Sequence, residues 1–157
     1  MGKTAEKTII RKLLPEDLPW LLLMDAAAFS EAWTKDTWME ELSGRLSHYI
    51  ALERNGVPIA YGGFWLVAGE AQVMRLAVAP AYQGQGLGLF LVEALIKTAR
   101  SLQAVEMTLE VRASNVPAQR TYQHLGFTAC GRRPQYYKDS GEDAILMRLA
   151  LTIEEKK

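Results

Sequence analysis

The sequence predicts a mixed α/β domain that is organised around one strand–turn–helix unit. Residues 72–79 are predicted to form a strand in which Met74, Leu76 and Val78 alternate with Val73, Arg75 and Ala77. A glycine-rich turn follows, and residues 86–102 then have the apolar periodicity of an amphipathic helix. A second alternating segment at residues 105–112 completes a βαβ unit. We therefore expect the two strands to be parallel neighbours joined by a right-handed crossover.

Composition and charge exclude several classes of protein. The 157 residues are 49% hydrophobic and 23% charged, which is typical of one globular domain over residues 1–157, with residues 1–7 and 151–157 as frayed tails. Basic and acidic residues number 18 each, so neither a nucleic acid nor a membrane surface is an expected partner. The one cysteine cannot form an internal disulfide, and the sequence has no signal peptide or transmembrane run. We expect a cytoplasmic protein.

Three strands and two helices are predicted before the central unit. The strands cover residues 8–13, 47–53 and 59–66. The first helix begins at Pro15, because proline suits a first helical turn, and continues to about Phe29. Thr34 can cap the second helix, which reaches Leu42. Asn55-Gly56 lies between the second and third strands and is a strong hairpin signal.

The elements after the central helix are predicted in the same way. Within residues 105–112, we expect Val105 to point inward together with the apolar residues that alternate after it, and we expect Leu102 on the apolar face of the preceding helix. Another helix begins near Ser114 and ends at Gly126, a good C-cap. Strands 127–132 and 143–149 follow, separated by a polar and aromatic loop. The total is six to seven strands and about four helices.

The glycine-rich turn predicts a binding site for a nucleotide-type cofactor. Gly84, Gly86 and Gly88 allow close approach of the backbone at the start of a helix, where unpaired N–H groups favour an anion. A dinucleotide fingerprint would need a glycine at Leu89, and a phosphate-binding P-loop would need a terminal Gly-Lys-Ser/Thr, which is absent. A glycine-rich helix cap without a ligand is the remaining structural alternative.

The turn Gln83-x-x-Gly86-x-Gly88 instead resembles the Q/R-x-x-G-x-G/A motif of the GNAT superfamily of N-acetyltransferases. Three further stretches appear in the order and spacing of that family: Glu110-Val-Arg-Ala-Ser-Asn115, Tyr122-x-x-x-Gly126-Phe127, and Arg132-Arg133 followed by Tyr136-Tyr137 and Glu142-Asp143. The resemblance covers about residues 8–150 and is greatest to the branch that acetylates ribosomal protein N-termini at alanine. It implies a mostly antiparallel, twisted sheet in which one parallel βαβ pair is splayed to hold acetyl-CoA.

The resemblance also implies roles for individual residues. Glu110 would be the general base, although a solvated carboxylate on the polar face of a strand is the structural alternative, and a peptide α-amine with a pKa of about 7.7–8.0 needs only a modest base. Tyr122 would be the general acid, with a core aromatic as its alternative. A backbone N–H near Val78 would meet the thioester carbonyl. Acetyl-CoA would contact Leu76, Ala77, Val78, Gln83, Gly84, Gln85, Gly86, Leu87, Gly88, Leu89 and Asn115, the last of which is equally suited to cap a helix.

The acceptor side is less well defined by the sequence. The resemblance implies that Trp33, Tyr136 and Tyr137 bind the acceptor peptide. Residues 25–41 contain five acids (Asp25, Glu31, Asp36, Glu40 and Glu41) against one base, Lys35, which would attract a basic ribosomal peptide or be ordinary solvated helix charge. The sequence departs from the family pattern at Gly84, a position that is often basic, and at Pro134-Gln135, where the branch that it most resembles is shorter.

The expected reaction is transfer of an acetyl group from acetyl-CoA to the N-terminal α-amine of a protein, by direct attack in a ternary complex. The acceptor implied is a ribosomal protein with a small first residue such as alanine. We expect Cys130 to be a small buried residue of a strand and not a nucleophile. We expect no metal site, because the two histidines, His48 and His124, are isolated and have no cysteine partner. A lysine or small-amine acetyltransferase and a non-catalytic acyl-CoA-binding regulator are the alternatives.

Overall fold

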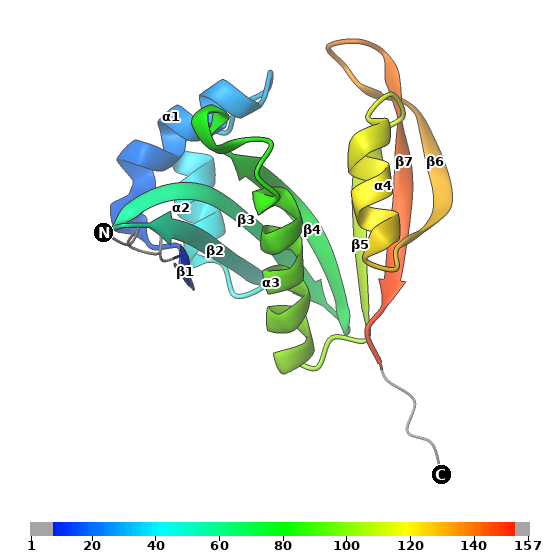
Figure 1. Ribbon diagram of the computed structural model, residues 1–157, viewed down its shortest axis with the longest axis horizontal. Helices are drawn as coiled ribbons and strands as arrows, with labels where there is room; N and C mark the ends of the chain where they lie inside the picture. Colours follow the sequence, from blue (N-terminus) through cyan, green and yellow to red (C-terminus); the bar gives the residue numbers. More distant parts are fainter. Residues whose placement is uncertain (1–7, 153–157) are drawn as a thin grey trace, which may run out of the picture.

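Seven strands form one twisted sheet in the computed structural model, which describes residues 8–152 (Figure 1). The strands are β1 (Thr8–Lys12), β2 (Ser47–Arg54), β3 (Val57–Val67), β4 (Glu70–Val78), β5 (Glu106–Arg112), β6 (Thr128–Tyr137) and β7 (Glu142–Ala150). Their order across the sheet is β1-β2-β3-β4-β5-β7-β6. All neighbours are antiparallel except β4 and β5, which are parallel, so the predicted βαβ unit and the mostly antiparallel sheet are confirmed.

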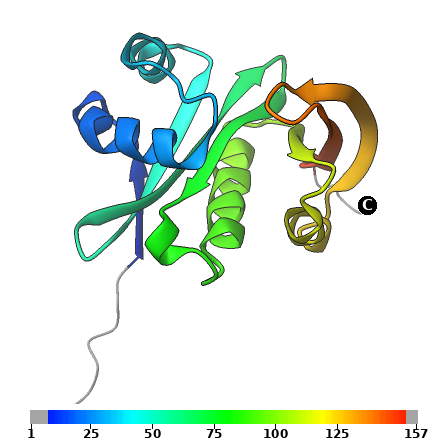
Figure 2. The ribbon, with the colours of Figure 1, turned by 90° about the horizontal axis from the view of Figure 1, so that it is seen from above.

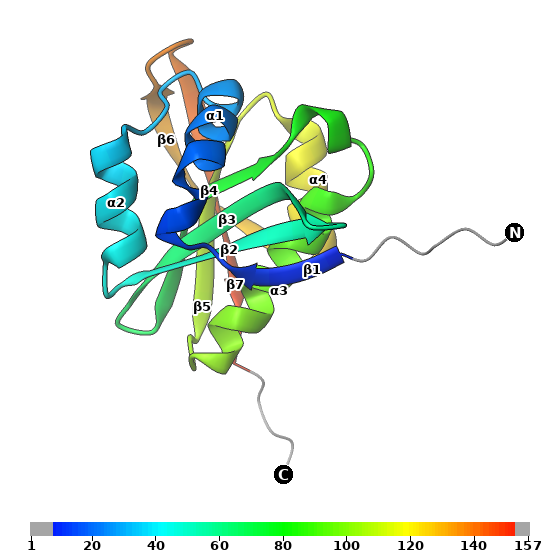
Figure 3. The ribbon, with the colours of Figure 1, turned by 90° about the vertical axis from the view of Figure 1, so that its left-hand side faces the viewer.

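Four α-helices cover the two faces of the sheet. They are α1 (Leu18–Ala28), α2 (Lys35–Ser43), α3 (Leu87–Ser101) and α4 (Val116–His124), and short 3-10 turns at Pro15–Asp17 and Pro80–Tyr82 precede α1 and α3. Figures 2 and 3 show α1 and α2 over one face, while α3 and α4 lie on the other. The core is accordingly divided into two clusters of buried residues, one on each side of the sheet.

Local sequence accounts for where the helices start and which sides they bury. Thr34 caps α2 by accepting a hydrogen bond from the Thr37 backbone N–H at 3.1 Å. Trp38 of α2 is fully buried, and its ring meets the rings of Tyr49 and Tyr61 edge-on at 5.4 and 5.6 Å. These aromatic contacts fix α2 on β2 and β3.

A β-bulge in β4 changes the direction of the strand that leads to the glycine-rich turn. Gly63 of β3 is opposite Arg75, but the next residue, Phe64, is opposite Val73, so Met74 is the extra residue on β4. A bulge bends its strand and increases the local twist. The last residues of β4 are therefore turned relative to the first.

The parallel pairing between β4 and β5 is correspondingly short. It covers three residues, from Glu70 opposite Glu106 to Gln72 opposite Thr108, and ends before the bulge. Figure 1 shows the two strands parting from this point while α3 follows β4 and α4 follows β5. The splayed pair that the sequence resemblance implies is present.

Some expectations about individual residues are wrong. Val105 precedes β5 and is exposed, and Leu102 is exposed because α3 ends at Ser101, before its apolar stripe would reach it. Cys130 is exposed on β6. Tyr136 and Tyr137 are not in a loop, because β6 continues through both.

The two tails predicted from the sequence are residues 1–7 and 151–157. Residues 1–7 and 153–157 lie outside the described part of the chain. Leu151 was expected in the C-terminal tail, but it is buried in the core and its backbone N–H donates to Val105 O at 2.8 Å. Between residues 8 and 152, the structure contains no helix of the length and apolarity needed to cross a membrane.

Gly63 offers a test of packing between the first strands. A Cβ at this position would lie 2.1 Å from the ring of Tyr49, its cross-strand partner, and Tyr49 is buried and held by a hydrogen bond to Glu41. We expect Gly63→Ala to lower the free energy of unfolding by about 1–3 kcal/mol and Tm by roughly 3–10 °C in thermal denaturation. Gly131→Ala is the matched control, since its Cβ would meet nothing closer than 3.6 Å, and an equal loss in both variants would contradict this account.

Candidate active site

A cleft of about 750 Å³ lies at the end of β4, beside the start of α3 and one side of α4. We refer to it as the α3 cleft. Ten of the residues expected to contact acetyl-CoA line it: Leu76, Ala77, Val78, Gln83, Gly84, Gly86, Leu87, Gly88, Leu89 and Asn115. Gln85 is the exception, because its side chain accepts a hydrogen bond from Arg54 at 3.1 Å and does not line the cleft.

The glycine-rich turn presents backbone N–H groups to the α3 cleft. Gly84 and Gly86 have φ values of +81° and +79°, a conformation that strongly favours glycine, although the space around both would admit a Cβ. Gly86 is the N-cap of α3, and no side chain caps the helix. The first N–H groups of α3 are therefore available to an anion, and the helix dipole favours negative charge there. This arrangement fits the pyrophosphate of coenzyme A.

The end of β4 supplies further unpaired backbone groups. The Ala79 N–H donates to Ile59 O on β3 at 2.8 Å, so by the alternation of an antiparallel ladder the N–H groups of Val78 and Leu76 point away from β3. No strand pairs with β4 on that side beyond Gln72. The Val78 carbonyl accepts a hydrogen bond from the Gln83 side chain at 3.1 Å, which ties the turn to the strand.

A second cleft, of about 950 Å³, adjoins the first, and we refer to it as the Glu110 cleft. Its lining includes Glu110 from β5, Trp33 from the α1–α2 loop, and Tyr136 and Tyr137 from β6. The two clefts share five lining residues: Ala28, Phe29, Leu76, Asn115 and Tyr122. The residues predicted to bind the acceptor therefore line only the Glu110 cleft, whereas Leu76 and Asn115, which were predicted to bind the donor, line both.

Tyr122 lies where the clefts meet. Burial raises its pKa above the usual value, so the hydroxyl keeps its proton through the neutral range and can act as a donor. The ring is fixed by an edge contact with Phe127, at 5.9 Å between centroids. Asn115, which also faces both clefts, caps α4 by accepting from the Ala118 N–H at 3.2 Å. The helix-cap role considered for this residue is therefore observed.

Two side chains of β6 contact the carboxylate of Glu110. Its Oε2 lies 2.6 Å from Nε of Arg133. The Tyr136 hydroxyl also donates to Glu110, and this hydrogen bond raises the pKa of Tyr136. Burial raises the pKa of Tyr137 to about 12, and the Arg112 guanidinium lies 4.0 Å above its ring. Both tyrosines are consequently neutral donors at physiological pH.

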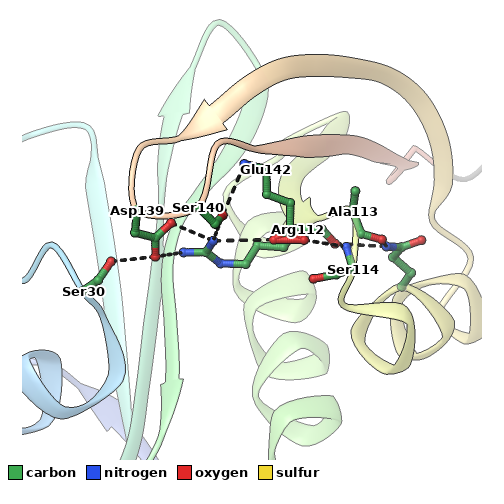
Figure 4. A network of polar contacts seen from close by, with 8 residues as sticks. Ser30, Arg112, Ala113, Ser114, Asp139, Ser140 and Glu142 are labelled. Carbon is green, nitrogen blue, oxygen red and sulfur yellow. Dashed lines mark hydrogen bonds and ion pairs between the residues drawn. The ribbon is translucent and has the colours of Figure 1, made fainter.

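The rim of the Glu110 cleft joins segments that are distant in the sequence (Figure 4). Arg112, at the end of β5, forms two hydrogen bonds to Asp139 in the β6–β7 turn, at 2.9 and 3.0 Å. The Ser30 hydroxyl, in the loop after α1, donates to the same carboxylate at 3.0 Å. Arg112 also lies 3.7 Å from Glu142, which accepts from the Ser114 N–H. The α1–α2 loop is thereby connected to the turn between β6 and β7 across the Glu110 cleft.

The acid-rich segment at residues 25–41 does not present five free charges. Asp25 is fully buried and accepts hydrogen bonds from Tyr61 at 2.5 Å and from the Trp33 N–H at 2.7 Å. It also forms an ion pair with Arg75 at 3.0 Å. Glu41 accepts from the side chains of Tyr49 and Trp65. Two of the five acids therefore stabilise the fold, which weakens the expected attraction for a basic peptide.

Several residues of the site were missed by sequence reasoning. Arg75 pairs with Asp25 and lies 3.9 and 4.3 Å from the rings of Phe29 and Trp33, so it fixes the wall of the Glu110 cleft. A signal was available, because Arg75 is a charged residue in the middle of an apolar central strand. Arg133 belongs to the Arg132-Arg133 stretch that resembles the family, but nothing in its local sequence indicates its partner, Glu110, which is 23 positions away on another strand.

The histidines are not part of either cleft lining. His48 packs against the ring of Phe64 at 5.4 Å, and burial lowers its pKa. His124 is exposed at the end of α4. Among residues 8–152, no three His, Cys, Asp or Glu side chains come together as a set that could bind a metal ion.

Comparison with known proteins defines the class of enzyme. The Acetyltransferase (GNAT) family profile matches residues 10–127. The chain therefore belongs to the GNAT family of acetyltransferases. The fit of the α3 cleft to a pyrophosphate agrees with this assignment.

Within the family, the chain is similar to ribosomal protein-alanine N-acetyltransferases. A Bacillus subtilis protein provisionally named a ribosomal protein bS18-alanine N-acetyltransferase is 37% identical over 142 residues, which are 90% of this chain and 94% of the relative. The Escherichia coli ribosomal protein bS18-alanine N-acetyltransferase is 35% identical over 92% of this chain and 98% of its own length. The crystal structure of the E. coli enzyme superposes with a TM-score of 0.87 at 34% identity, covering 96% of this chain and 97% of the other.

Gly86 tests the anion site at the start of α3. Gly86→Ala strains a left-handed residue, and we expect it to misplace the first N–H groups of the helix and to weaken coenzyme A binding roughly tenfold, measured by isothermal titration calorimetry. Gly69→Ala is the matched control, because Gly69 has φ +82° in the remote β3–β4 turn. Both variants should lose stability by about 1 kcal/mol. Equal coenzyme A affinity in the two variants would rule out the anion site.

Asp25 tests the buried charge behind the Glu110 cleft. Asp25→Ala leaves the largely buried guanidinium of Arg75 without its carboxylate, and we expect a loss of about 3–5 kcal/mol in the free energy of unfolding by urea denaturation. Glu40→Ala, an exposed acid on α2, should change stability by no more than about 0.5 kcal/mol. Similar losses in the two variants would show that burial of the pair has no special role.

Proposed function

We propose that this acetyltransferase modifies the N-terminal α-amine of a protein, and that its acceptor is the N-terminal alanine of ribosomal protein bS18, as in the names of its relatives. The observation that carries the proposal is the pair of adjoining clefts, with Glu110 lining one of them and Tyr122 lining both. A base on the acceptor side and an acid at the junction are what acyl transfer to an amine requires. A ribosomal acceptor implies a reaction in the cytoplasm.

We assign the α3 cleft to acetyl-CoA. The N–H groups at the start of α3 would bind the pyrophosphate, and the unpaired backbone groups at the end of β4 would bind the pantetheine arm. This leaves the thioester near Val78, beside the junction of the clefts. The Val78 N–H would then donate to the thioester oxygen as it becomes negative, which requires no charged side chain.

The chemical steps follow from these positions. The α-ammonium of the acceptor loses one proton to solvent as it binds, and the neutral nitrogen attacks the thioester carbon. Glu110, directly or through water, takes the second proton, which the nitrogen must lose for the amide to form. Negative charge on the oxygen is stabilised by the Val78 N–H, and the C–S bond then breaks. Tyr122 gives its proton to the sulfur and later regains one from solvent, while Glu110 releases its proton. The products are the N-acetylated protein and the free thiol of coenzyme A.

Direct transfer is favoured over an acetylated enzyme. Cys130 is the one cysteine of the chain, and it lines neither cleft. Trp33, Tyr136 and Tyr137 line the Glu110 cleft, and we assign them to the acceptor's first residues.

Acceptor preference is tested by a library of synthetic peptides in a coenzyme A release assay, with products located by mass spectrometry. We expect acetylation of the α-amine of peptides that begin with alanine, and much slower reaction of peptides that begin with methionine or have a blocked N-terminus and an internal lysine. Preferential modification of lysine would contradict the proposal. Binding of acetyl-CoA without turnover on any peptide would favour a regulatory protein.

The proposed acid and base are tested separately. We expect Glu110→Gln and Tyr122→Phe each to lower kcat by about 10²–10⁴-fold, because each removes one proton transfer. Coenzyme A affinity should stay within about twofold in Glu110→Gln, since Glu110 does not line the α3 cleft. The raised pKa of Tyr122 predicts that its proton is not lost below pH 10, so the rate should show no alkaline decline up to that pH. A decline near pH 8–9 that Tyr122→Phe abolishes would contradict this.

A further inference from the structure

The carboxylate of Glu110 already has a cationic partner. Nε of Arg133, on β6, lies 2.6 Å from Oε2 of Glu110, and the two side chains retain 57% and 26% of their accessible surface. The Tyr136 hydroxyl donates to the same carboxylate. Arg133 also lies 5.9 Å from the ring of Tyr136. A base that must receive a proton from an ammonium group is thus bound to a guanidinium before the acceptor arrives.

The path of β6 explains how these groups reach Glu110. Arg133 and Tyr137 both pair with β7, but residues 134–136 between them oppose one residue of β7, Asp143. Two extra residues therefore bulge from β6 between the paired positions. The bulge brings Tyr136 to the carboxylate that Arg133 contacts.

Asp143 fixes the shape of the bulge. Its Oδ1 accepts from the Gln135 N–H at 2.9 Å, and its Oδ2 accepts from Nε of Arg132 at 2.6 Å. Gln135 has φ +51°, an uncommon conformation for a residue other than glycine. The Arg132 guanidinium holds the pKa of Asp143 below its usual range, so these contacts persist at neutral pH. Arg133 and Tyr136 are consequently presented by a defined backbone.

An unpaired carboxylate beside the acceptor would have an unwanted effect. It would stabilise the α-ammonium, which is the unreactive form, and so hold the proton on the nitrogen that must attack. Arg133 contacts the carboxylate but does not line the Glu110 cleft, so its guanidinium offsets that field without occupying the space of the acceptor. We propose that Arg133 is a positioning residue that orients Glu110 and neutralises its charge, so that the acceptor's α-amine is bound in its neutral form. This inference rests on the proposed function.

Two other arginines that face the Glu110 cleft have carboxylate partners of their own. Arg75 pairs with Asp25, and Arg112 pairs with Asp139. Glu31, in the α1–α2 loop, and Lys138, after β6, are exposed at the rim of the Glu110 cleft. The remaining titratable groups near the carboxylate are Tyr122 on α4, Tyr136 and Tyr137 on β6, and Glu142 on β7. Arg133 is the cation in direct contact with Glu110, so its removal changes the local charge most.

The experiment is a pH profile of the single-turnover rate of acetyl transfer to a peptide that begins with alanine, with enzyme saturated by acetyl-CoA and peptide. Under these conditions the acidic limb reports the ionisation of the bound complex. We expect Arg133→Gln to move this limb upward by roughly 0.5–1 pH unit, the size of a screened charge effect at about 6 Å. The plateau rate at high pH should fall by less than about fivefold. In Arg133→Lys, which keeps the positive charge, the acidic limb should lie close to that of the unchanged protein.

Arg148→Gln is the matched control. Arg148 on β7 pairs with Glu106 on β5 at 2.5 Å, with exposures of 50% and 27%, and neither residue lines a cleft. Its acidic limb should coincide with that of the unchanged protein.

Three results would overturn the inference: an unmoved limb in Arg133→Gln, a lower rate at every pH without a shift, or a rise in peptide KM alone. The second would indicate a structural role and the third a direct contact with the acceptor. Turnover of the peptide by the unchanged protein tests the proposed function by itself, so the two failures are distinguishable.

Discussion

The separation of β4 from β5 is the constraint on which the rest of the site depends. Parallel pairing ends at Gln72, and the bulge at Met74 turns the remainder of β4 away. A regular parallel pair would have satisfied the N–H groups of Leu76 and Val78 within the sheet. Because the strands part, these groups face the space where a thioester can lie. The same separation places the start of α3 and the side of α4 on opposite walls of one cleft.

Ion pairs build the acceptor side of the enzyme. Arg75, Arg112 and Arg133 each bond a carboxylate that comes from a different element: Asp25 from α1, Asp139 from the β6–β7 turn and Glu110 from β5. Each pair connects segments that helix or sheet hydrogen bonds do not join directly. The Glu110 cleft is therefore close to neutral in charge, and shape and hydrogen bonding are better placed than net charge to select its acceptor.

The donor half of the site was predictable because its signals are local. The turn from Gln83 to Gly88 and the helix after it are contiguous, so spacing and residue type excluded the dinucleotide and P-loop alternatives, and the resemblance to the GNAT motif indicated acetyl-CoA. Gln85 shows the limit of this reasoning, because its side chain turns toward Arg54. The acceptor half was predicted less well. Ser30 and Asp139 meet across 109 positions of sequence, and no periodicity in either segment indicates that contact.

The sequence by itself indicated the family, the βαβ unit and the alternation of buried and partly exposed side chains along β5, since these depend on local pattern. It also proposed Glu110 and Tyr122 for proton transfer, from their chemical type and the family resemblance. Tertiary structure decided the environment of those residues. Asp25 became a buried structural acid, Leu151 joined the core, and Glu110 gained Arg133 as a partner. Burial and ion pairing arise between segments that are distant in the chain, so only the folded arrangement could assign them.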